Sequence, residues 1–117
     1  MSNLFLAFKH ATRGLIIGVK SERNLKIHAL AALLVIFLSL ITSISLIDFI
    51  ILLLMIGLVI GMELVNSAIE KICDVLRDRY HLPYEASRDI RDIAAGAVWL
   101  QAIIAALIGV LIFSKYL

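Results

Sequence analysis

The sequence predicts an all-α integral membrane protein, in which an N-terminal amphipathic surface helix is followed by three transmembrane helices. Of the 117 residues, 62% are hydrophobic and 17% are charged, and the mean hydropathy is +1.04. A typical soluble domain has about 45–50% apolar and about 25% charged residues, and a small one cannot bury so many apolar side chains. The composition excludes a soluble enzyme and a disordered tail. The single cysteine, Cys73, excludes a disulfide-stapled scaffold, and the net charge of +2 does not indicate nucleic-acid binding.

Charge-free runs locate the three spans within a single domain, residues 1–117. Residues 27–47 and 93–114 contain no Asp, Glu, Lys or Arg, and each run is long enough to cross a hydrocarbon core of about 30 Å. Between them, residues 49–62 are apolar until Glu63 interrupts the run. A helix starting at Asp48 reaches Glu63 after about 22 Å, still inside the membrane. The middle span is therefore predicted at 49–69, with an acid inside it.

Basic residues predict the orientation of these spans. They gather before the first span and in the 70–92 loop, whereas the hairpin from Thr42 to Asp48 has no Lys or Arg. The positive-inside rule places the N-terminus and the 70–92 loop in the cytoplasm, and the hairpin and C-terminus outside. Lys115 is the one basic residue near the outer end, and its long side chain can snorkel to the interface.

Residues 3–20 have the pattern of a basic amphipathic helix. At 100° per residue, Lys9, Arg13 and Lys20 fall within about 40° of one another. Apolar residues cluster on the opposite side: Leu4, Phe8, Leu15 and Val19. Such a helix is suited to lie on an anionic leaflet. The alternative is a helix that packs on the bundle with its basic face in water.

The most informative residues are four polar side chains that share one helix face. Steps of three, four and four residues place Glu63, Asn66, Glu70 and Asp74 within about 60° of each other. An acid at membrane depth costs about 2.5–3.5 kcal/mol or more, so this face favours a cation site or an acid–base site. The alternative is an interhelical hydrogen-bond cluster that holds the bundle together.

Glu63 and Glu70 lie at different depths along the helix, and we expect different chemistry of them. Glu70 lies about 10 Å further along than Glu63, near the cytoplasmic interface, where oxygen ligands suit Mg²⁺ bound to substrate phosphates. Glu63 is deeper and can take a proton from an alcohol that arrives from the lipid. Glu22 lies at the level of Glu70 and is a candidate second metal ligand, or else forms a surface ion pair with Arg23 or Lys26.

The start of the third span offers a phosphate contact. Arg91 can bind phosphate through two N–H groups, or it belongs to a solvated helix start. Three other kinds of site are missing from the sequence. There is no P-loop, no zinc spacing of Cys and His, and no Gly-x-Ser-x-Gly elbow.

These residues resemble the small prokaryotic diacylglycerol kinase family. The central match is Glu63-Leu-Val-Asn66-Ser67-Ala68-Ile69-Glu70, followed by Asp74. Further matches cover nearly the whole chain: Arg13-Gly14-Leu15, Glu22-Arg23-Asn24 with His28, Tyr80-His81, and Arg91-Asp92-Ile93-Ala94-Ala95-Gly96-Ala97-Val98. The Asn-Ser-Ala-Ile-Glu core is a specific motif in so short and apolar a chain.

The resemblance implies a lipid kinase of the bacterial cytoplasmic membrane, assembled as a homotrimer whose shared active sites face the cytoplasm. It implies that Glu63 is the catalytic base and that Glu22 and Glu70 hold Mg²⁺ on the phosphates of ATP. The residues matched to nucleotide contacts are Glu22, Glu70, Tyr80, His81, Arg91, Asp92 and His10, and those matched to a supporting polar face are Asn66 and Asp74. The chain departs from the family at His10, where a tyrosine is frequent, and at Arg91, where lysine is usual.

The lipid substrate is the less determined part. The segment from Ser21 to His28 resembles the Gram-positive branch of the family, which phosphorylates undecaprenol. The alternative is diacylglycerol, the substrate of the enterobacterial branch. From another class, a small oligomeric proton-coupled transporter could use Glu63 as its intramembrane acid, although such proteins usually have four spans. A requirement for MgATP distinguishes a kinase from a transporter.

Overall fold

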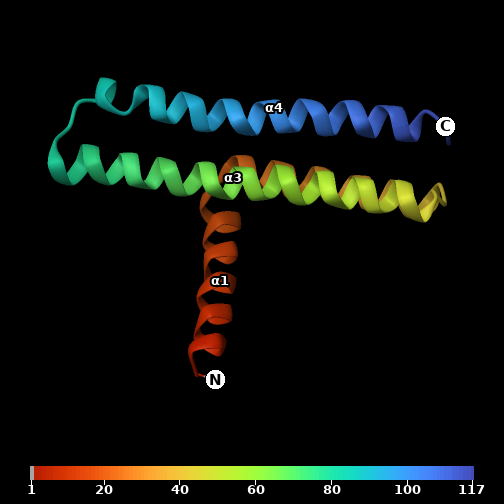
Figure 1. Ribbon diagram of the computed structural model, residues 1–117, viewed down its shortest axis with the longest axis horizontal. Helices are drawn as coiled ribbons and strands as arrows, with labels where there is room; N and C mark the ends of the chain where they lie inside the picture. The colour runs from red at the N-terminus through yellow and green to blue at the C-terminus, as the bar shows by residue number, and fades with distance from the viewer. Residues whose placement is uncertain (1) are drawn as a thin grey trace.

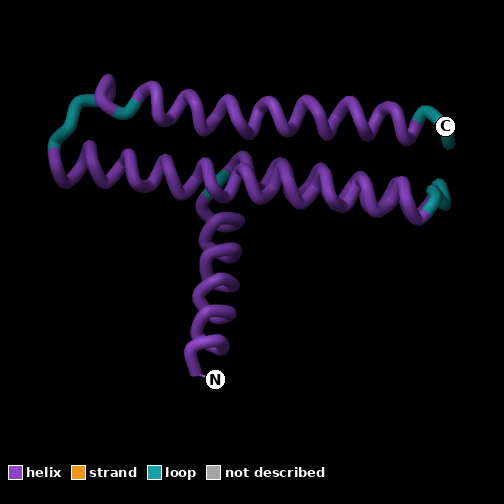
Figure 2. The backbone as a smooth tube through the Cα atoms, viewed as in Figure 1, coloured by secondary structure: helices purple, strands orange, loops and turns teal. Residues whose placement is uncertain are grey.

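The computed structural model describes residues 2–117, and the described chain consists of helices joined by short turns and loops (Figure 2). The elements are α1 (Ser2–Ser21), α2 (Arg23–Ile41), α3 (Leu46–Tyr80), a 3₁₀ turn η1 (Tyr84–Ala86) and α4 (Arg88–Phe113). Helices α2, α3 and α4 are each long and apolar enough to cross a membrane. The predicted all-α class is therefore confirmed, and three helices have the length and composition that the predicted spans require.

Helix α3 is the axis of the bundle, and α2 and α4 run antiparallel to it (Figure 1). Helix α1 projects sideways from the bundle, and the C-terminal end of α1 is the end that joins it (Figure 1). A Cβ atom at Gly18 would lie 2.7 Å from Leu64 Cδ2 and 3.0 Å from Leu25 Cδ2, so glycine permits the close approach of α1 to α2 and α3. Residues 3–20 are thus helical as predicted, and the apolar side chains along α1 are largely exposed.

The length of α3 exceeds what a membrane crossing needs. Its 35 residues span about 52 Å at 1.5 Å per residue, whereas a hydrocarbon core is about 30 Å thick. With Asp48 at one boundary, the last turns from Glu70 to Tyr80 extend past the other. The helix is therefore long enough to carry Glu70 and Asp74 beyond a hydrocarbon core that begins at Asp48.

The helix boundaries differ from the predicted spans at the α2–α3 hairpin. The predicted first span, 27–47, runs past the end of α2 at Ile41 and includes the turn and the start of α3. The turn consists of uncharged residues, among them Ser43 with φ 51°, and a charge-free run therefore does not mark where the helix ends. Ser45 starts α3 by accepting a hydrogen bond from the backbone N–H of Asp48 at 3.2 Å.

A polar contact, the hairpin clasp, fastens the C-terminus to this hairpin. It consists of Ser45, Asp48, Lys115 and Tyr116. The buried Asp48 carboxylate accepts hydrogen bonds from Tyr116 Oη at 2.6 Å and Lys115 Nζ at 2.9 Å. Tyr116 Oη also accepts from the backbone N–H of Ser45 at 3.0 Å. Next to the clasp, Leu52 of α3 packs with the end of α4 in a small apolar core.

The clasp also affects the acid–base behaviour of its lysine. The hydrogen bond from Lys115 to Asp48 raises the pKa of the Lys115 ammonium. Because the pKa of Lys115 is higher in the folded than in the unfolded protein, its bond to Asp48 stabilises the fold at neutral pH. This contribution is lost as the pH rises through the folded-state pKa of Lys115. The clasp therefore holds at neutral pH.

We predict that Tyr116→Phe lowers the midpoint of thermal unfolding in detergent micelles. The Tyr116 hydroxyl accepts a hydrogen bond from Ser45 and donates one to Asp48. Without it, the buried Asp48 carboxylate loses a short hydrogen bond. Tyr80→Phe is the matched control, because that side chain is 68% exposed. An equal midpoint for the two variants would show that the clasp does not contribute to stability.

Candidate active site

Glu63 is a buried carboxylate in the middle of the bundle. Its side chain is 3% exposed and lies on α3, beside His28 of α2. Its ionisable neighbour among residues 2–117 is His28 of α2, whose Nε2 lies 3.8 Å from Glu63 Oε2. His28 is more open, at 25% exposed. The intramembrane acid that the sequence indicated is therefore paired with a group that can donate a hydrogen bond to it.

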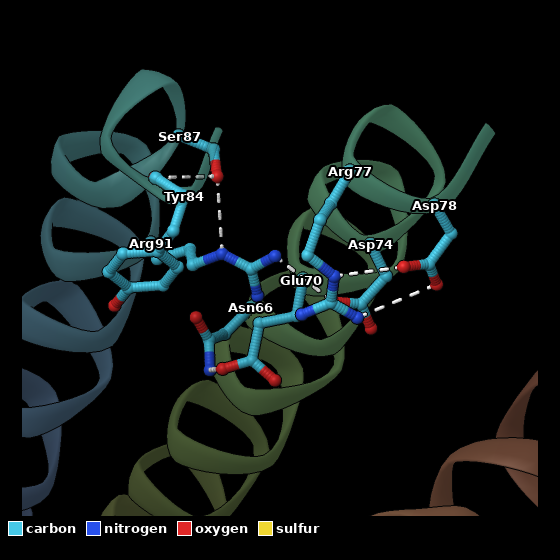
Figure 3. Close-up of polar contacts among 8 residues, drawn as sticks. All are labelled: Asn66, Glu70, Asp74, Arg77, Asp78, Tyr84, Ser87 and Arg91. Carbon is cyan, nitrogen blue, oxygen red and sulfur yellow. Dashed lines mark hydrogen bonds and ion pairs between the residues drawn. The ribbon is translucent and has the colours of Figure 1, made fainter. Parts of the chain in front are cut away.

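Asn66 and Ser67 carry the polar face from Glu63 toward Glu70. Asn66 Nδ2 donates to Glu70 Oε1 at 3.4 Å, which joins the two residues one helical turn apart (Figure 3). Asn66 Oδ1 and Ser67 Oγ are buried, and neither has a hydrogen-bond partner within the described chain. A buried polar atom without a partner costs about 1–3 kcal/mol, so these two atoms are the unsatisfied polar groups of this face.

Glu22 lies at the junction between α1 and α2 and contacts α3 beside this face. Its Oε1 lies 3.7 Å from Lys71 Nζ on α3. Because Lys71 directly follows Glu70, the ion pair places Glu22 at the level of Glu70. The structure does not pair Glu22 with Arg23 or Lys26, which was the simpler alternative for this residue.

Arg91 of α4 reaches across to α3 and holds the loop between the two helices (Figure 3). Its Nη2 donates to Asp74 Oδ1 at 3.0 Å, and its Nε donates to Ser87 Oγ at 3.3 Å. The guanidinium carbon lies 5.7 Å from the centre of the Tyr84 ring, within cation–π range. Asp74 also faces Arg77 at 3.6 Å. The Asp74 carboxylate thus lies next to two guanidinium groups, those of Arg77 and Arg91.

The remaining predicted nucleotide residues are exposed and more widely spread. Tyr80 and His81 lie at the end of α3, where His81 adopts a left-handed conformation and the helix stops. Asp92 lies on the first turns of α4 with its side chain in solvent. His10 is exposed on α1, eight residues before Gly18, where α1 meets α2 and α3.

An apolar groove of about 440 Å³ runs along the bundle between α2 and α4, with α3 as its floor. Small residues widen it, among them Ala31, Ala102 and Gly109. His28 is the one polar residue in its lining. The groove therefore connects the hydrocarbon-facing part of the bundle with the His28–Glu63 pair.

The donor atoms are of the kind that binds a magnesium ion shared with phosphates. Mg²⁺ in such sites uses one or two carboxylates and keeps its other ligands as water and phosphate oxygens. Glu22 and Glu70 supply two carboxylates, and Asn66 Oδ1 is an unpaired oxygen beside Glu70. Among residues 2–117, no group of three or more His, Cys, Asp and Glu side chains lies close enough to hold a metal by itself.

Sequence reasoning missed several members of this cluster. Helical spacing does not reveal contacts between different elements. The contacts missed in this way are His28 with Glu63, Lys71 with Glu22, and Tyr84 and Ser87 with Arg91. Ser67 is different, because it falls on the same helix face as Glu63 and Glu70. Extending the helical-wheel analysis to hydroxyl groups would have found it.

The fold and the site are those of a small multi-pass membrane protein with a buried acid on its central helix and a charge cluster near the end of that helix. The family described as prokaryotic diacylglycerol kinase matches residues 9–113, and the chain belongs to that family. An undecaprenol kinase of Bacillus subtilis (strain 168) is 38% identical over 113 residues, which cover 97% of this chain and 89% of the relative. A diacylglycerol kinase of Synechocystis sp. is 33% identical over 108 residues, covering 92% of this chain and 60% of the relative. No solved structure matches the chain.

We predict that Asp74→Asn loosens the loop between α3 and α4. The charge-assisted bond to Arg91 is lost, and with it the tie between Ser87 and α3. The expected result is faster tryptic cleavage after Arg88 in detergent. Asp78→Asn is the control, because Asp78 is exposed and bonds its sequence neighbour Arg77. Equal cleavage rates in the two variants would contradict a loop-holding role for Asp74.

Proposed function

We propose that the protein transfers the γ-phosphate of ATP to the primary hydroxyl of a membrane lipid, with undecaprenol as the substrate and undecaprenyl phosphate as the product. The 38% identity to an undecaprenol kinase over nearly all of both chains supports this choice. Diacylglycerol, giving phosphatidic acid, is the alternative substrate, because a relative of that name is 33% identical.

The single observation that carries the proposal is the placement of Glu63. A carboxylate that is 3% exposed lies beside the end of an apolar groove. After Glu63, the same helix α3 continues toward the aqueous side and carries Asn66, Glu70 and Asp74 on the same face. This arrangement lets a long hydrocarbon approach from the membrane and a charged nucleotide approach from water.

The residues then divide the reaction as follows. Glu63 accepts the proton of the lipid hydroxyl while that oxygen attacks the γ-phosphorus, and ADP leaves in line without a phosphoenzyme. Glu22 and Glu70 hold Mg²⁺, which when bound neutralises phosphate charge. Asn66 and Asp74 support this face. Arg91, Asp92, Tyr80, His81 and His10 form the nucleotide side.

We extend the proposal to the setting of the enzyme. The active site faces the cytoplasm of a bacterial cell, as the distribution of basic residues favours, and α1 lies on the membrane surface with its exposed apolar side chains in the lipid. The protein acts as a homotrimer with shared sites. In support of assembly, His10 is exposed on α1 eight residues before Gly18, where α1 meets α2 and α3, and is open to contact with a neighbouring chain.

We predict that the purified protein transfers labelled phosphate from MgATP to undecaprenol in mixed micelles faster than to diacylglycerol. Glu63→Gln lowers kcat by about 10²–10⁴-fold, the usual contribution of a general base. Glu85→Gln is the control, since Glu85 is an exposed acid on η1. No transfer to either lipid by folded protein would overturn the kinase proposal and favour the transporter. Faster transfer to diacylglycerol would overturn the choice of substrate.

We predict that Glu22→Gln and Glu70→Gln each raise the Mg²⁺ concentration needed for half-maximal transfer by about tenfold or more. Each substitution removes a charged oxygen ligand and leaves the shape of the side chain. Mn²⁺ binding followed by electron paramagnetic resonance, with a non-hydrolysable ATP analogue present, gives a readout without turnover. Unchanged Mn²⁺ affinity in both variants would exclude these carboxylates as metal ligands.

A further inference from the structure

The imidazole of His28 has a specific relation to Glu63 that the proposed reaction does not yet use. Its Nε2 is 3.8 Å from Glu63 Oε2, about 1 Å longer than a charge-assisted hydrogen bond. Catalytic hydrogen bonds are often long in unliganded structures and tighten when substrate binds. A small rotation of either side chain closes this gap.

Burial makes this contact important for the orientation of Glu63. With 3% of the side chain exposed, the carboxylate has little water to solvate it, and its own helix does not supply it with a hydrogen-bond donor within the described chain. A buried carboxylate without a donor is costly and free to rotate. His28 is the group positioned to satisfy one oxygen and leave the other for the substrate.

The position of the groove indicates from which side a lipid would approach the His28–Glu63 pair. His28 is the one polar residue that lines the groove, and Glu63 lies behind it rather than in the lining. A hydrocarbon chain in the groove therefore reaches the His28–Glu63 pair with its terminal hydroxyl. On this arrangement Oε2 faces the imidazole, and Oε1 remains to accept the proton of the alcohol.

We infer that His28 is a positioning residue for the catalytic base, which donates a hydrogen bond from Nε2 to Glu63 Oε2 and fixes the carboxylate toward the lipid hydroxyl. The inference rests on the proposed lipid kinase function. It assigns His28 no proton transfer and no contact with the phosphates. It requires a donor at the Nε2 position and does not require a group that titrates.

Two substitutions of similar polarity test this requirement. Glutamine can place an N–H group near the position of Nε2, whereas asparagine is one bond shorter and cannot. His28→Leu and His28→Asn should each lower kcat by roughly tenfold or more, the scale of one lost hydrogen bond to a charged group. His28→Gln should recover most of the rate. The KM values for lipid and MgATP should change little in all three variants.

A double-mutant cycle separates positioning from a general effect on the fold. In the Glu63→Gln background, His28→Leu should cause no further loss of kcat, because the carboxylate to be positioned is already gone. Leu33→Ala on the same helix is the control, since Leu33 is exposed at the hydrocarbon-facing surface. Thermal unfolding midpoints identify any variant that fails to fold. A glutamine variant as slow as leucine, losses that add, or a rise in KM without a fall in kcat would each overturn the inference.

A measurement without turnover keeps the inference separate from the kinase proposal. In protein with ¹⁵N-labelled histidine, the Nε2 resonance of His28, assigned by its loss in His28→Gln, should shift in Glu63→Gln and stay unchanged in Glu85→Gln. An unshifted resonance would overturn the pairing whatever the enzyme phosphorylates. A shifted resonance in a protein that phosphorylates neither lipid would uphold the pairing and remove only its catalytic meaning.

Discussion

The buried carboxylate of Glu63 is the constraint on which the rest of the structure depends. A charged group at membrane depth is costly, so the helix that carries it must face the bundle interior and must be covered on both sides. Helices α2 and α4 pack against α3, and His28 of α2 lies beside the carboxylate. The same packing creates the apolar groove. The requirement to shelter one acid thus determines which face of α3 is inside.

Helix α3 links the membrane interior to the aqueous side because it is much longer than the hydrocarbon core is thick. At one end the hairpin clasp holds Asp48, and at the other Asp74 holds Arg91. Between these two carboxylates lie Glu63 and Glu70, about two helical turns apart on the same face. A single rigid helix therefore fixes the depth of each acid relative to the others, which loops could not do with the same accuracy.

The polar cluster beyond the hydrocarbon was predicted only in part from the sequence. Helical spacing correctly placed Asn66, Glu70 and Asp74 on the face of Glu63, because these residues share one helix and its period is fixed. The pairing of Glu22 with Lys71 was not predicted, and neither was that of Arg91 with Ser87. These contacts join elements whose relative rotation depends on packing across the bundle, and spacing along one helix carries no information about it.

By itself the sequence determined the class of protein, the number of spans and the acidic face of the central helix. Each of these follows from local rules, namely the length of a charge-free run and the 3.6-residue period. Only the tertiary structure decided that the first span ends at Ile41 and that α1 packs closely against α2 and α3 at Gly18. It alone also decided that His28 meets Glu63. Those features arise from side chains of different helices coming into contact, and a linear sequence does not state which surfaces meet.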